Sequence, residues 1–484
     1  MASTIVIFGA SGDLTSRKLV PALYQLFLKK RLPPETRVVG FARSKFSSDE
    51  WRNKLAETTR QFTGSDFDPG QWAEFSAHVF YHSGNLDCDA DFTALASHLN
   101  ELEGGGPSTR VYYFATAPQL YLEGATRLGA AGLADQSHGP RRIVIEKPFG
   151  TDLQTARELN AGVHKVFSEP QVYRIDHYLG KETVQNIMVL RFANTIFEPI
   201  WNRNYIDNVM ITVAEEVVVG RRAGYYDTAG VMRDFFQNHI LQLLTVTAME
   251  VPSRFEADLV RNEKVKVLQA IRPMTSDDVI DNTVRGQYVG YRQEPDVPPE
   301  SQTATYAALK LHVDNWRWQG VPFYLRSGKA LSCRTTQIVI QFRQPPHTVF
   351  DSAKHRSPDA NRLVMHIQPS EGIQIHFQTK VPDSGMKLRF TDLEFRFKTE
   401  FGKVMPEAYE RLLLDTLIGD ASLFARSDEV ELAWGIIDPI LKTWQETNLP
   451  DLAFYEPGGW GPLDAQKWIW KDGREWLDAC PALK

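Results

Sequence analysis

The sequence contains no uninterrupted apolar run of the roughly 20 residues that a membrane-spanning helix needs. Its first residues, MASTIVIFGASGDL, enter a strand-like run at once and lack the pattern of a secretory signal peptide. We therefore expect a cytoplasmic protein with no membrane partner.

Cysteine is scarce. The three cysteines, Cys88, Cys333 and Cys480, are odd in number and widely spaced. This spacing offers neither a disulfide framework nor the ligand pattern of a zinc site. Metal-free chemistry in a reducing compartment is the expectation that follows.

The sequence also has no excess of positive charge. Its 54 Lys and Arg residues are outnumbered by 60 Asp and Glu residues, which gives a net charge of −6. Nucleic acid is therefore not an expected partner, and a phosphorylated ligand would need a local basic patch. The 484 residues, 43% of them hydrophobic, show no low-complexity tract or obvious repeat. A chain of this length exceeds one hydrophobic core, which predicts two domains.

Residues 174–182, RIDHYLGKE, gather unusually many functional groups between a strand-like run and a helix-like run. They hold a carboxylate (Asp176), an imidazole (His177), a phenol (Tyr178) and an ammonium (Lys181). A helix beginning just after Lys181 would present free N–H groups and partial positive charge, which suit a phosphate. We interpret the stretch as an anion-binding corner with a catalytic carboxylate. The alternative for any one of these residues is a solvated turn with an ordinary cap.

The N-terminal stretch TIVIFG (4–9) predicts a strand buried on both faces of a parallel sheet. A glycine turn and a helix-like segment follow, which is the order of a dinucleotide-binding unit. Its G-x-x-G pattern is shorter than the full G-x-G-x-x-G, so alone it is a weak signal. The candidate coenzyme contacts here are Gly9, Ser11, Gly12, Asp13, Leu14 and Lys18.

The second strand, VVGFA (38–42), ends at Arg43. An acidic residue near this point would bind the ribose 2′-hydroxyl of NAD, whereas an arginine accommodates the 2′-phosphate of NADP. The sequence thus favours NADP, with Arg43 as the contact; the alternative is a surface arginine at a strand end.

Further strands are predicted at 79–83, 111–117 and 141–148, with helices near 49–62, 90–103, 119–131 and 152–167. This alternation predicts an α/β, Rossmann-like, doubly wound parallel sheet over residues 1–172. Ligands of such sheets lie beyond the carboxyl ends of the strands. Asn85, Leu86, residues 115–118 and Lys147 are expected there.

Lys147 follows a strand in EKPFG (146–150), where its ammonium could contact both the coenzyme and a sugar hydroxyl. The alternative is a charged strand end. A cis bond before Pro148 is possible but cannot be read from the sequence.

The second half of the chain has a different pattern of predicted helices and strands. Residues 182–194 predict a helix and 209–217 a strand carrying Glu215 and Glu216, of which at most one faces a given site. Residues 228–250 have apolar residues at helical spacing, with His239 among them. His239 could be a satisfied core histidine. In α-helical geometry Asp234 lies about 140° from it, so Asp176 is the candidate carboxylate partner.

From residue 305 onward strands dominate, which predicts an α+β domain over 173–484 with a large, mostly antiparallel mixed sheet. A basic loop, LRSGKALSCR (325–334), interrupts it with Arg326, Lys329 and Arg334. Helices are expected near 406–427 and 429–446. Exposed sheet edges and faces favour a homodimer or homotetramer.

These motifs, in this order, resemble the glucose-6-phosphate dehydrogenase family from Thr4 to about Trp476. GASGDLTSRKL, EKPFG, RIDHYLGKE, RDFFQNHILQ and LRSGKAL carry the resemblance, and RIDHYLGKE is the most specific. The resemblance implies oxidation of D-glucose 6-phosphate at C1 to the phosphogluconolactone with NADP as acceptor, the entry step of the pentose phosphate pathway. Residues 1–172 would bind NADP, and 173–484 would bind substrate and form the oligomer.

The resemblance also implies roles for single residues. His239 matches the general base and Asp176 the carboxylate that orients it. The implied substrate contacts are His177, Tyr178, Lys181, Glu215, Asp234, Lys329, Arg334 and Lys147, and Lys147 would touch the coenzyme too. The resemblance implies that Arg43 contacts the 2′-phosphate of the coenzyme. Asn85 and Leu86 are expected coenzyme contacts because of their place beyond the strand ends.

Two features depart from the family pattern. Ala117 stands where many members have the first of two prolines, and the long tail of the animal enzymes is missing after Trp476, so a second, structural NADP site is not carried over.

Two rival functions remain: another sugar oxidoreductase, of the inositol-dehydrogenase type, and a non-catalytic NADP(H)-binding regulator. An assay for NADPH formation separates them.

Overall fold

Residues 2–347, 349, 360–402 and 405–480 are described by the computed structural model of this protein. The chain divides into two units, and each is described by itself. The first comprises residues 1–181, 252–262 and 406–431; the second comprises residues 182–251, 263–405 and 432–484.

The first unit is built on a parallel sheet that has six strands among the described residues, in the order β3-β2-β1-β4-β5-β6. Its strands are β1 (Ala2–Phe8), β2 (Thr36–Ala42), β3 (Val79–Ser83), β4 (Ser108–Phe114), β5 (Arg141–Ile145) and β6 (Val172–Arg174). The order reverses between β1 and β4, as in a doubly wound fold. The Rossmann-like sheet predicted from the sequence is confirmed.

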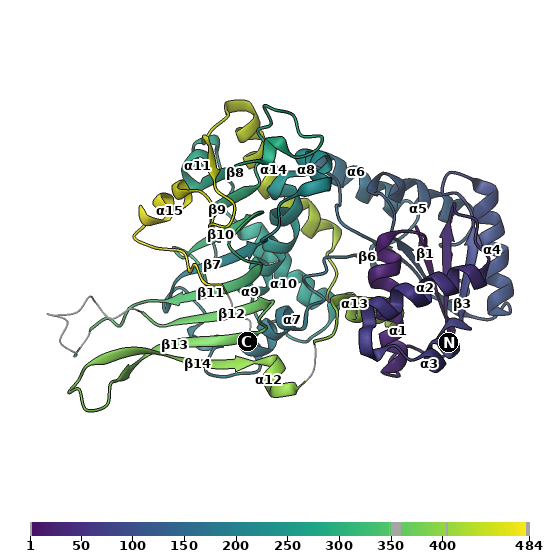
Figure 1. Ribbon diagram of the computed structural model, residues 1–484, viewed down its shortest axis with the longest axis horizontal. Coiled ribbons are helices and arrows are strands. Elements are labelled where there is room, and N and C mark those ends of the chain that lie inside the picture. Colours follow the sequence, from purple (N-terminus) through teal and green to yellow (C-terminus); the bar gives the residue numbers. More distant parts are fainter. Residues whose placement is uncertain (1, 348, 350–359, 403–404, 481–484) are drawn as a thin grey trace. The chain divides into compact units, whose positions relative to one another are not determined.

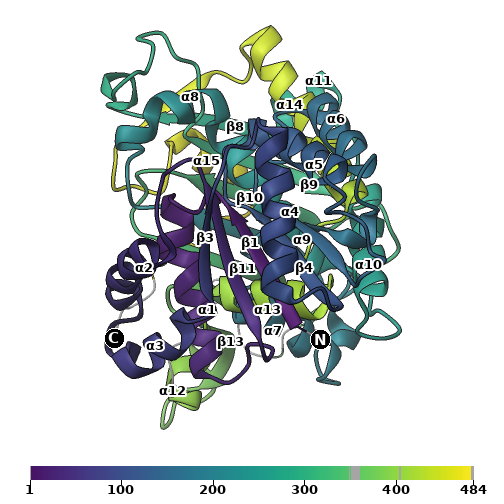
Figure 2. The ribbon, with the colours of Figure 1, turned by 90° about the vertical axis from the view of Figure 1, so that its right-hand side faces the viewer.

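The helices of this unit connect the strands. They are η1 (Thr15–Leu19), α1 (Val20–Leu28), α2 (Ser48–Thr63), α3 (Pro69–Ser76), α4 (Asp89–Glu103), α5 (Tyr121–Ala130) and α6 (Leu153–His164), with α13 (Ala408–Ile418) from far along the chain. Figure 2 shows α1 and α2 to one side of the strands and α4 and α5 to the other. The strands are buried because Val, Ile and Phe side chains fill both of their faces.

The second unit is built on a mixed sheet that has nine strands within the described part of the chain, in the order β14-β13-β12-β11-β7-β10-β9-β8-β15 (Figure 1). Six of its eight pairings are antiparallel; β7 with β10 and β8 with β15 are parallel. This confirms the mostly antiparallel sheet. The strands are β7 (Ile206–Ala214), β8 (Thr283–Tyr288), β9 (Tyr306–His312), β10 (Pro322–Gly328), β11 (Thr335–Phe342), β12 (Arg362–Gln368), β13 (Gly372–Lys380), β14 (Leu388–Arg396) and β15 (Leu452–Tyr455).

The helices of the second unit include a long buried run in its middle. They are α7 (Glu182–Phe192), α8 (Ala223–Val231), η7 (Met232–Ile240), α9 (Leu241–Ala248), α11 (Ser276–Asn282), α12 (Phe397–Phe401) and α15 (Leu463–Trp470). The residues of α10 (Ala257–Ala270) and α14 (Ser427–Thr447) are divided between the units. A cluster of buried tyrosines, including Tyr226, Tyr306 and Tyr324, fills part of the core beside the sheet.

The cysteine prediction was wrong. Cys333 and Cys480, 147 residues apart in sequence, form a disulfide, with their Cα atoms 6.0 Å apart. The C-terminal segment runs back along β10 and β11: the carbonyl oxygen of Leu477 accepts hydrogen bonds from Gln337 Nε2 (2.9 Å) and Arg326 Nη2 (3.3 Å). This return places Cys480 beside the β10–β11 loop, and sequence spacing gives no sign of it.

No helix in residues 2–347, 349, 360–402 or 405–480 has the length and apolar composition to cross a membrane.

Candidate active site

The carboxyl ends of the six parallel strands bring together, within the first unit, the residues that the sequence singled out there. In the register of the sheet, Phe8 lies opposite Phe41 and Phe114, and Ile145 lies opposite Arg174. Parallel strands in register end at one edge of their sheet. That edge therefore collects the glycine turn at 9–12, Arg43, Asn85 with Leu86, residues 115–118, Lys147 and Asp176.

The glycine turn is tightly constrained at Gly9. Its φ is +83°, and a Cβ there would lie 2.4 Å from the carbonyl oxygen of Ala115. The Gly9 N–H donates to the carbonyl of Phe41 (3.0 Å), and the Gly12 N–H donates to the carbonyl of Gly9 (2.9 Å). The helix that follows begins at Asp13. A turn of this kind brings backbone N–H groups and a helix N-terminus to one point, which suits a pyrophosphate.

Arg43 follows the last residue of β2, and its side chain is exposed. Asn85 lies two residues after β3, where its N–H donates to the carboxylate of Asp91 (2.7 Å). Gly84 permits this turn because a Cβ at that position would lie 2.5 Å from the ring of Phe41.

Lys18 makes a contact that the sequence did not suggest. Its Nζ lies 3.1 Å from the carboxylate of Glu407, and both side chains are largely exposed. The neighbouring Arg17 lies 3.7 Å from Asp13 and stacks over the ring of Phe62. An exposed ion pair of this kind contributes little to stability, so coenzyme phosphate could compete for Lys18.

Lys147 lies two residues after β5, and its bond to Pro148 is cis. Its neighbour Glu146 accepts hydrogen bonds from the hydroxyls of Tyr113 (2.5 Å) and Tyr409 (3.0 Å). Loss of water around Glu146 raises its pKa more than these two hydroxyls lower it. This network fixes the backbone just before Lys147. Sequence reasoning missed it because Tyr409 comes from α13, more than 250 residues away.

The corner after β6 is folded tightly. Asp176 is buried, and its Oδ1 accepts the N–H of Tyr178 (2.9 Å), an Asx turn that holds the carboxylate in place. Lys181 Nζ stands 5.4 Å from the centre of the Tyr178 ring. A Cβ on Gly180 would lie 2.7 Å from the carbonyl oxygen of Ala408, so this glycine permits the close approach of α13.

In the second unit, Lys329 joins the two acidic residues predicted near the sugar. Its Nζ pairs with the carboxylate of Glu215 and lies 3.3 Å from Asp234 Oδ2. Its ammonium also stands 4.9 Å from the centre of the Phe235 ring. Glu216, by contrast, is exposed. Three separate segments, the end of β7, helix η7 and the β10–β11 loop, thus supply one polar cluster.

His239 is buried, at 1% exposure, in the same helix as Asp234. Its ring meets that of Phe235 edge to face at 5.9 Å. The segment is not the plain α-helix expected. Gly230, with φ +62°, breaks it, and residues 232–240 form a π-helix. The angle calculated between Asp234 and His239 from α-helical geometry was therefore wrong, because a π-helix bonds residues five apart.

Arg334 is exposed at the end of the β10–β11 loop, and its Nη2 lies 3.5 Å from Gln368 Oε1. It is therefore available to a ligand from solvent, but the structure does not join it to the Lys329 cluster.

Comparison with known sequences identifies the family. Residues 6–186 match the NAD binding domain of glucose-6-phosphate dehydrogenase, and residues 188–477 match the C-terminal domain of that enzyme. The chain belongs to the glucose-6-phosphate dehydrogenase family. It is accordingly an oxidoreductase.

Relatives of the family cover nearly the whole chain. The glucose-6-phosphate 1-dehydrogenase of Aggregatibacter actinomycetemcomitans is 46% identical over 98% of this chain and 96% of its own length. That of Rhizobium meliloti is 43% identical over 98% and 97%.

Solved structures of glucose-6-phosphate dehydrogenases share the fold. One in complex with its substrate glucose 6-phosphate has a TM-score of 0.91 and 35% identity over 98% of both chains. The glucose-6-phosphate 1-dehydrogenase of Mycobacterium avium has a TM-score of 0.86 and 34% identity over 99% of both chains.

Proposed function

We propose that this chain oxidises D-glucose 6-phosphate at C1 to 6-phospho-D-glucono-1,5-lactone and transfers the hydride to NADP. The observation that carries the proposal is the likeness to a solved glucose-6-phosphate dehydrogenase bound to that substrate, with a TM-score of 0.91 over 98% of both chains. The Lys329 cluster beside the helix of His239, in the second unit, supports it.

The proposed role of His239 follows from the chemistry of the substrate. A C1 hydroxyl is a poor hydride donor until its proton leaves, so a base of near-neutral pKa must accept that proton. His239 is this base in our proposal. Asp176, whose carboxylate the Asx turn holds in place, is proposed to fix the tautomer of His239 and to stabilise its cationic form.

The remaining residues have proposed binding roles. Lys181, His177 and Tyr178 hold the sugar phosphate, with Arg334 as a second basic contact. Glu215, Asp234 and Lys329 contact the sugar hydroxyls: the Lys329 ammonium donates, and the two carboxylates that it pairs with accept.

NADP, when bound, supplies the hydride acceptor. The residues at the strand ends of the first unit fit its shape: the constrained turn at Gly9 and Gly12 receives the pyrophosphate, and the exposed Arg43 receives the 2′-phosphate. Ser11, Asp13, Leu14, Lys18, Asn85 and Leu86 complete the proposed coenzyme contacts, and Lys147 touches both ligands.

A homodimer or homotetramer is part of the proposal. The outer strands β13 and β14 are largely half-buried or exposed along their length, and Leu393 in β14 is 60% exposed. An unpaired apolar side chain on a sheet face is what a partner copy would cover.

A coenzyme-reduction assay tests the proposed function. We expect NADPH formation with glucose 6-phosphate and NADP, at a kcat/KM far above that with glucose or with NAD. A sugar dehydrogenase of the inositol type would accept unphosphorylated sugars equally well. A non-catalytic regulator would form no NADPH with any of them.

A further inference from the structure

The helical run that carries His239 has two geometries. Residues Met232–Ile240 are π-helical, and α9 continues the run directly from Leu241 to Ala248. A π-helix is rare and occurs mostly as short insertions, often at functional sites. If this segment rewound to an α-helix, each of its residues would move to a different position around the helix axis. The position of His239 therefore depends on what holds the two ends of the run.

The end of α9 is held by a buried arginine from another helix. The last carbonyls of an α-helix have no partner within it. Arg191, in α7, donates through Nη1 to the carbonyls of Val246 (3.2 Å) and Thr247 (3.0 Å), and through Nη2 to that of Met249 (2.8 Å). Its positive charge also complements the negative end of the helix dipole.

Two indoles complete this anchor. Trp201 Nε1 donates to the carbonyl of Thr247 (2.9 Å), and Trp318 Nε1 donates to that of Ala248 (2.8 Å). Both tryptophans are fully buried. The end of α9 is thus fixed from three separate segments of the chain.

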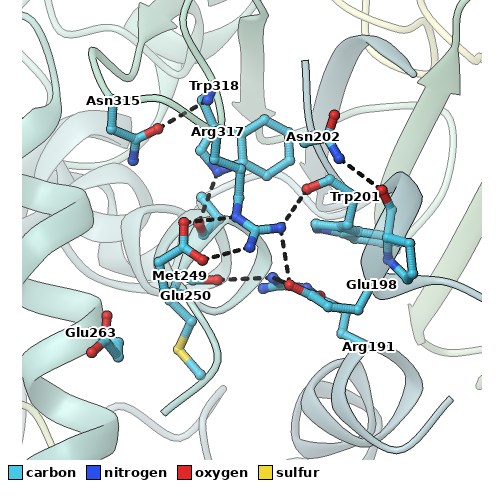
Figure 3. A network of polar contacts seen from close by, with 12 residues as sticks. Arg191, Glu198, Trp201, Asn202, Met249, Glu250, Glu263, Asn315, Arg317 and Trp318 are labelled. Atoms are coloured by element: carbon cyan, nitrogen blue, oxygen red, sulfur yellow. Dashed lines mark hydrogen bonds and ion pairs between the residues drawn. The ribbon is translucent and has the colours of Figure 1, made fainter. Parts of the chain in front are cut away.

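Arg191 is itself held by a charge network that runs from its buried guanidinium through Glu198 and Arg317 to the exposed Glu250 (Figure 3). Its Nη2 lies 3.1 Å from the carboxylate of Glu198, whose other oxygen lies 2.9 Å from Arg317 Nη1. Arg317 in turn donates to both carboxylate oxygens of Glu250. Burial lowers the pKa of Arg191 to about 10, so the side chain is still cationic near neutral pH.

The other end of the run is held as well. The Val231 N–H donates to the carbonyl of Ala304 (3.0 Å), and Asp234 pairs with Lys329. Both ends of a stiff helical rod are therefore fixed, with the π-helical segment between them.

We propose that Arg191 is a positioning residue: by anchoring the end of α9 it maintains the π-helical register that sets the place of His239. The proposal rests on the proposed role of His239 as the base. His239 lies nine residues before Ala248, about 13 Å along the axis at 1.5 Å per residue. Removing Arg191 leaves the carbonyls of Thr247 and Ala248 held by the two indoles but frees those of Val246 and Met249 from the guanidinium. This weaker anchor lets the run shift along its axis or rewind to an α-helix.

The chain offers a matched control. Arg285 is also a buried arginine that caps a helix end, since it donates to the carbonyl of Trp444 (3.4 Å) in the last turn of α14 and to those of Asn448 (2.6 Å) and Pro450 (2.7 Å) just after it. None of these three hydrogen bonds involves the helical run that carries His239. Arg191→Ala and Arg285→Ala therefore each remove a buried guanidinium from the carbonyls at a helix end, in two different helices.

The experiment compares kcat, KM for glucose 6-phosphate and melting temperature for both variants. For Arg191→Ala we expect kcat to fall about a hundredfold, the loss that a misplacement of about 1 Å can cause. KM should change less than about threefold, because the proposed phosphate contacts lie outside the run and Asp234 keeps its pairing with Lys329. Arg285→Ala should lower the melting temperature to a similar extent but keep kcat within about threefold of the wild-type value.

Guanidinium rescue gives a second readout. A cavity of about 660 Å³ is lined by Arg191, Asn202 and Trp316, and Trp316 is 89% exposed, so a small cation can enter from solvent. Millimolar guanidinium chloride should restore part of the lost kcat in Arg191→Ala. Arg191→Lys, which retains the charge, replaces this variant if the alanine form does not fold, and an intermediate kcat is then expected.

Wild-type kcat in Arg191→Ala or Arg191→Lys would overturn the proposal. So would equal losses of kcat in the Arg191 and Arg285 variants at equal melting temperature. A separate His239→Asn variant keeps the two ideas apart: if it retained wild-type kcat, the proposed function of His239 would fail, whatever the Arg191 result.

Discussion

Arg43 shows what a single side chain at a strand end contributes. It follows β2 two residues after Phe41, whose carbonyl accepts the N–H of Gly9, so it stands next to the glycine turn. A charge-assisted contact with the 2′-phosphate contributes about 1.5–3 kcal/mol. Arg43→Ala should therefore raise KM for NADP at least about tenfold and leave KM for NAD nearly unchanged.

Steady-state kinetics with both coenzymes measure this effect. Arg60→Ala, which removes another arginine of the same unit, serves as the control and should change neither value. Equal rises in KM for NADP and NAD would show that Arg43 does not read the 2′-phosphate.

Lys181 is expected to bind the sugar phosphate rather than to act in the chemical step. Its ammonium lies over the ring of Tyr178, at the corner that Asp176 folds. Lys181→Ala should raise KM for glucose 6-phosphate about 10- to 100-fold through the lost charge-assisted hydrogen bond, with kcat nearly kept. Lys165→Ala, an exposed lysine at the end of α6, is the control. An unchanged KM in folded Lys181→Ala protein would count against the role.

Single residues are also the scale at which the sequence makes its most specific predictions. The proposed carboxylate, base and lysines of the candidate site could be named because each lies in a short, chemically unusual motif. Glu146 and Arg191 could not be assigned roles in the same way. Their partners, Tyr409 in one case and the carbonyls of α9 in the other, come from distant segments that no local pattern links to them.

Among the elements, β1, β4 and α4 are joined by one buried ion pair. Glu103 in α4 lies 2.7 Å from Arg110 Nη2 and accepts hydrogen bonds from Thr4 (2.8 Å) and Ser108 (2.7 Å). Burial alone would raise the pKa of Glu103, but the bonds from Arg110, Ser108 and Thr4 outweigh it and the pKa is lowered. A lowered carboxyl pKa stabilises the fold above the unfolded value of about 4.3, and this stability is lost as the pH falls through the folded value.

Glu103→Gln leaves the Arg110 guanidinium buried without its counter-charge, which should cost about 3–5 kcal/mol near neutral pH. The difference in melting temperature from the wild type should shrink as the pH falls below about 4. Thermal unfolding from pH 7 to pH 3 measures it, with the exposed Glu101→Gln as control. A difference that stayed constant over this range would contradict the assignment.

The elements themselves were predictable to differing degrees. Strand and helix alternation identified the parallel sheet, because buried Val and Ile runs and glycine turns are local signals. The π-helix at 232–240 was missed because a nine-residue segment is too short for its apolar spacing to distinguish a π-helix from an α-helix. The predicted strands at 111–117 and 141–148 end earlier, at Phe114 and Ile145, and the residues that follow them lie at the edge where the coenzyme is proposed to bind.

For the whole molecule, the sequence predicted the order of the two sheets and missed the return of the C-terminus. Cys480 reaches Cys333 only because the segment after α15 folds back along β10 and β11. A contact between residues 147 positions apart depends on the complete fold and cannot be inferred from the spacing of the cysteines in the sequence.

The account as a whole depends on the proposed roles of one histidine and one carboxylate. The most direct measurement is kcat for NADPH formation by His239→Asn, Asp176→Asn and the double variant, with saturating glucose 6-phosphate and NADP. We predict that His239→Asn lowers kcat at least about a hundredfold with KM broadly kept, and that the double variant is no slower than the His239 single variant. A His239→Asn enzyme with near-wild-type kcat would contradict the central claim.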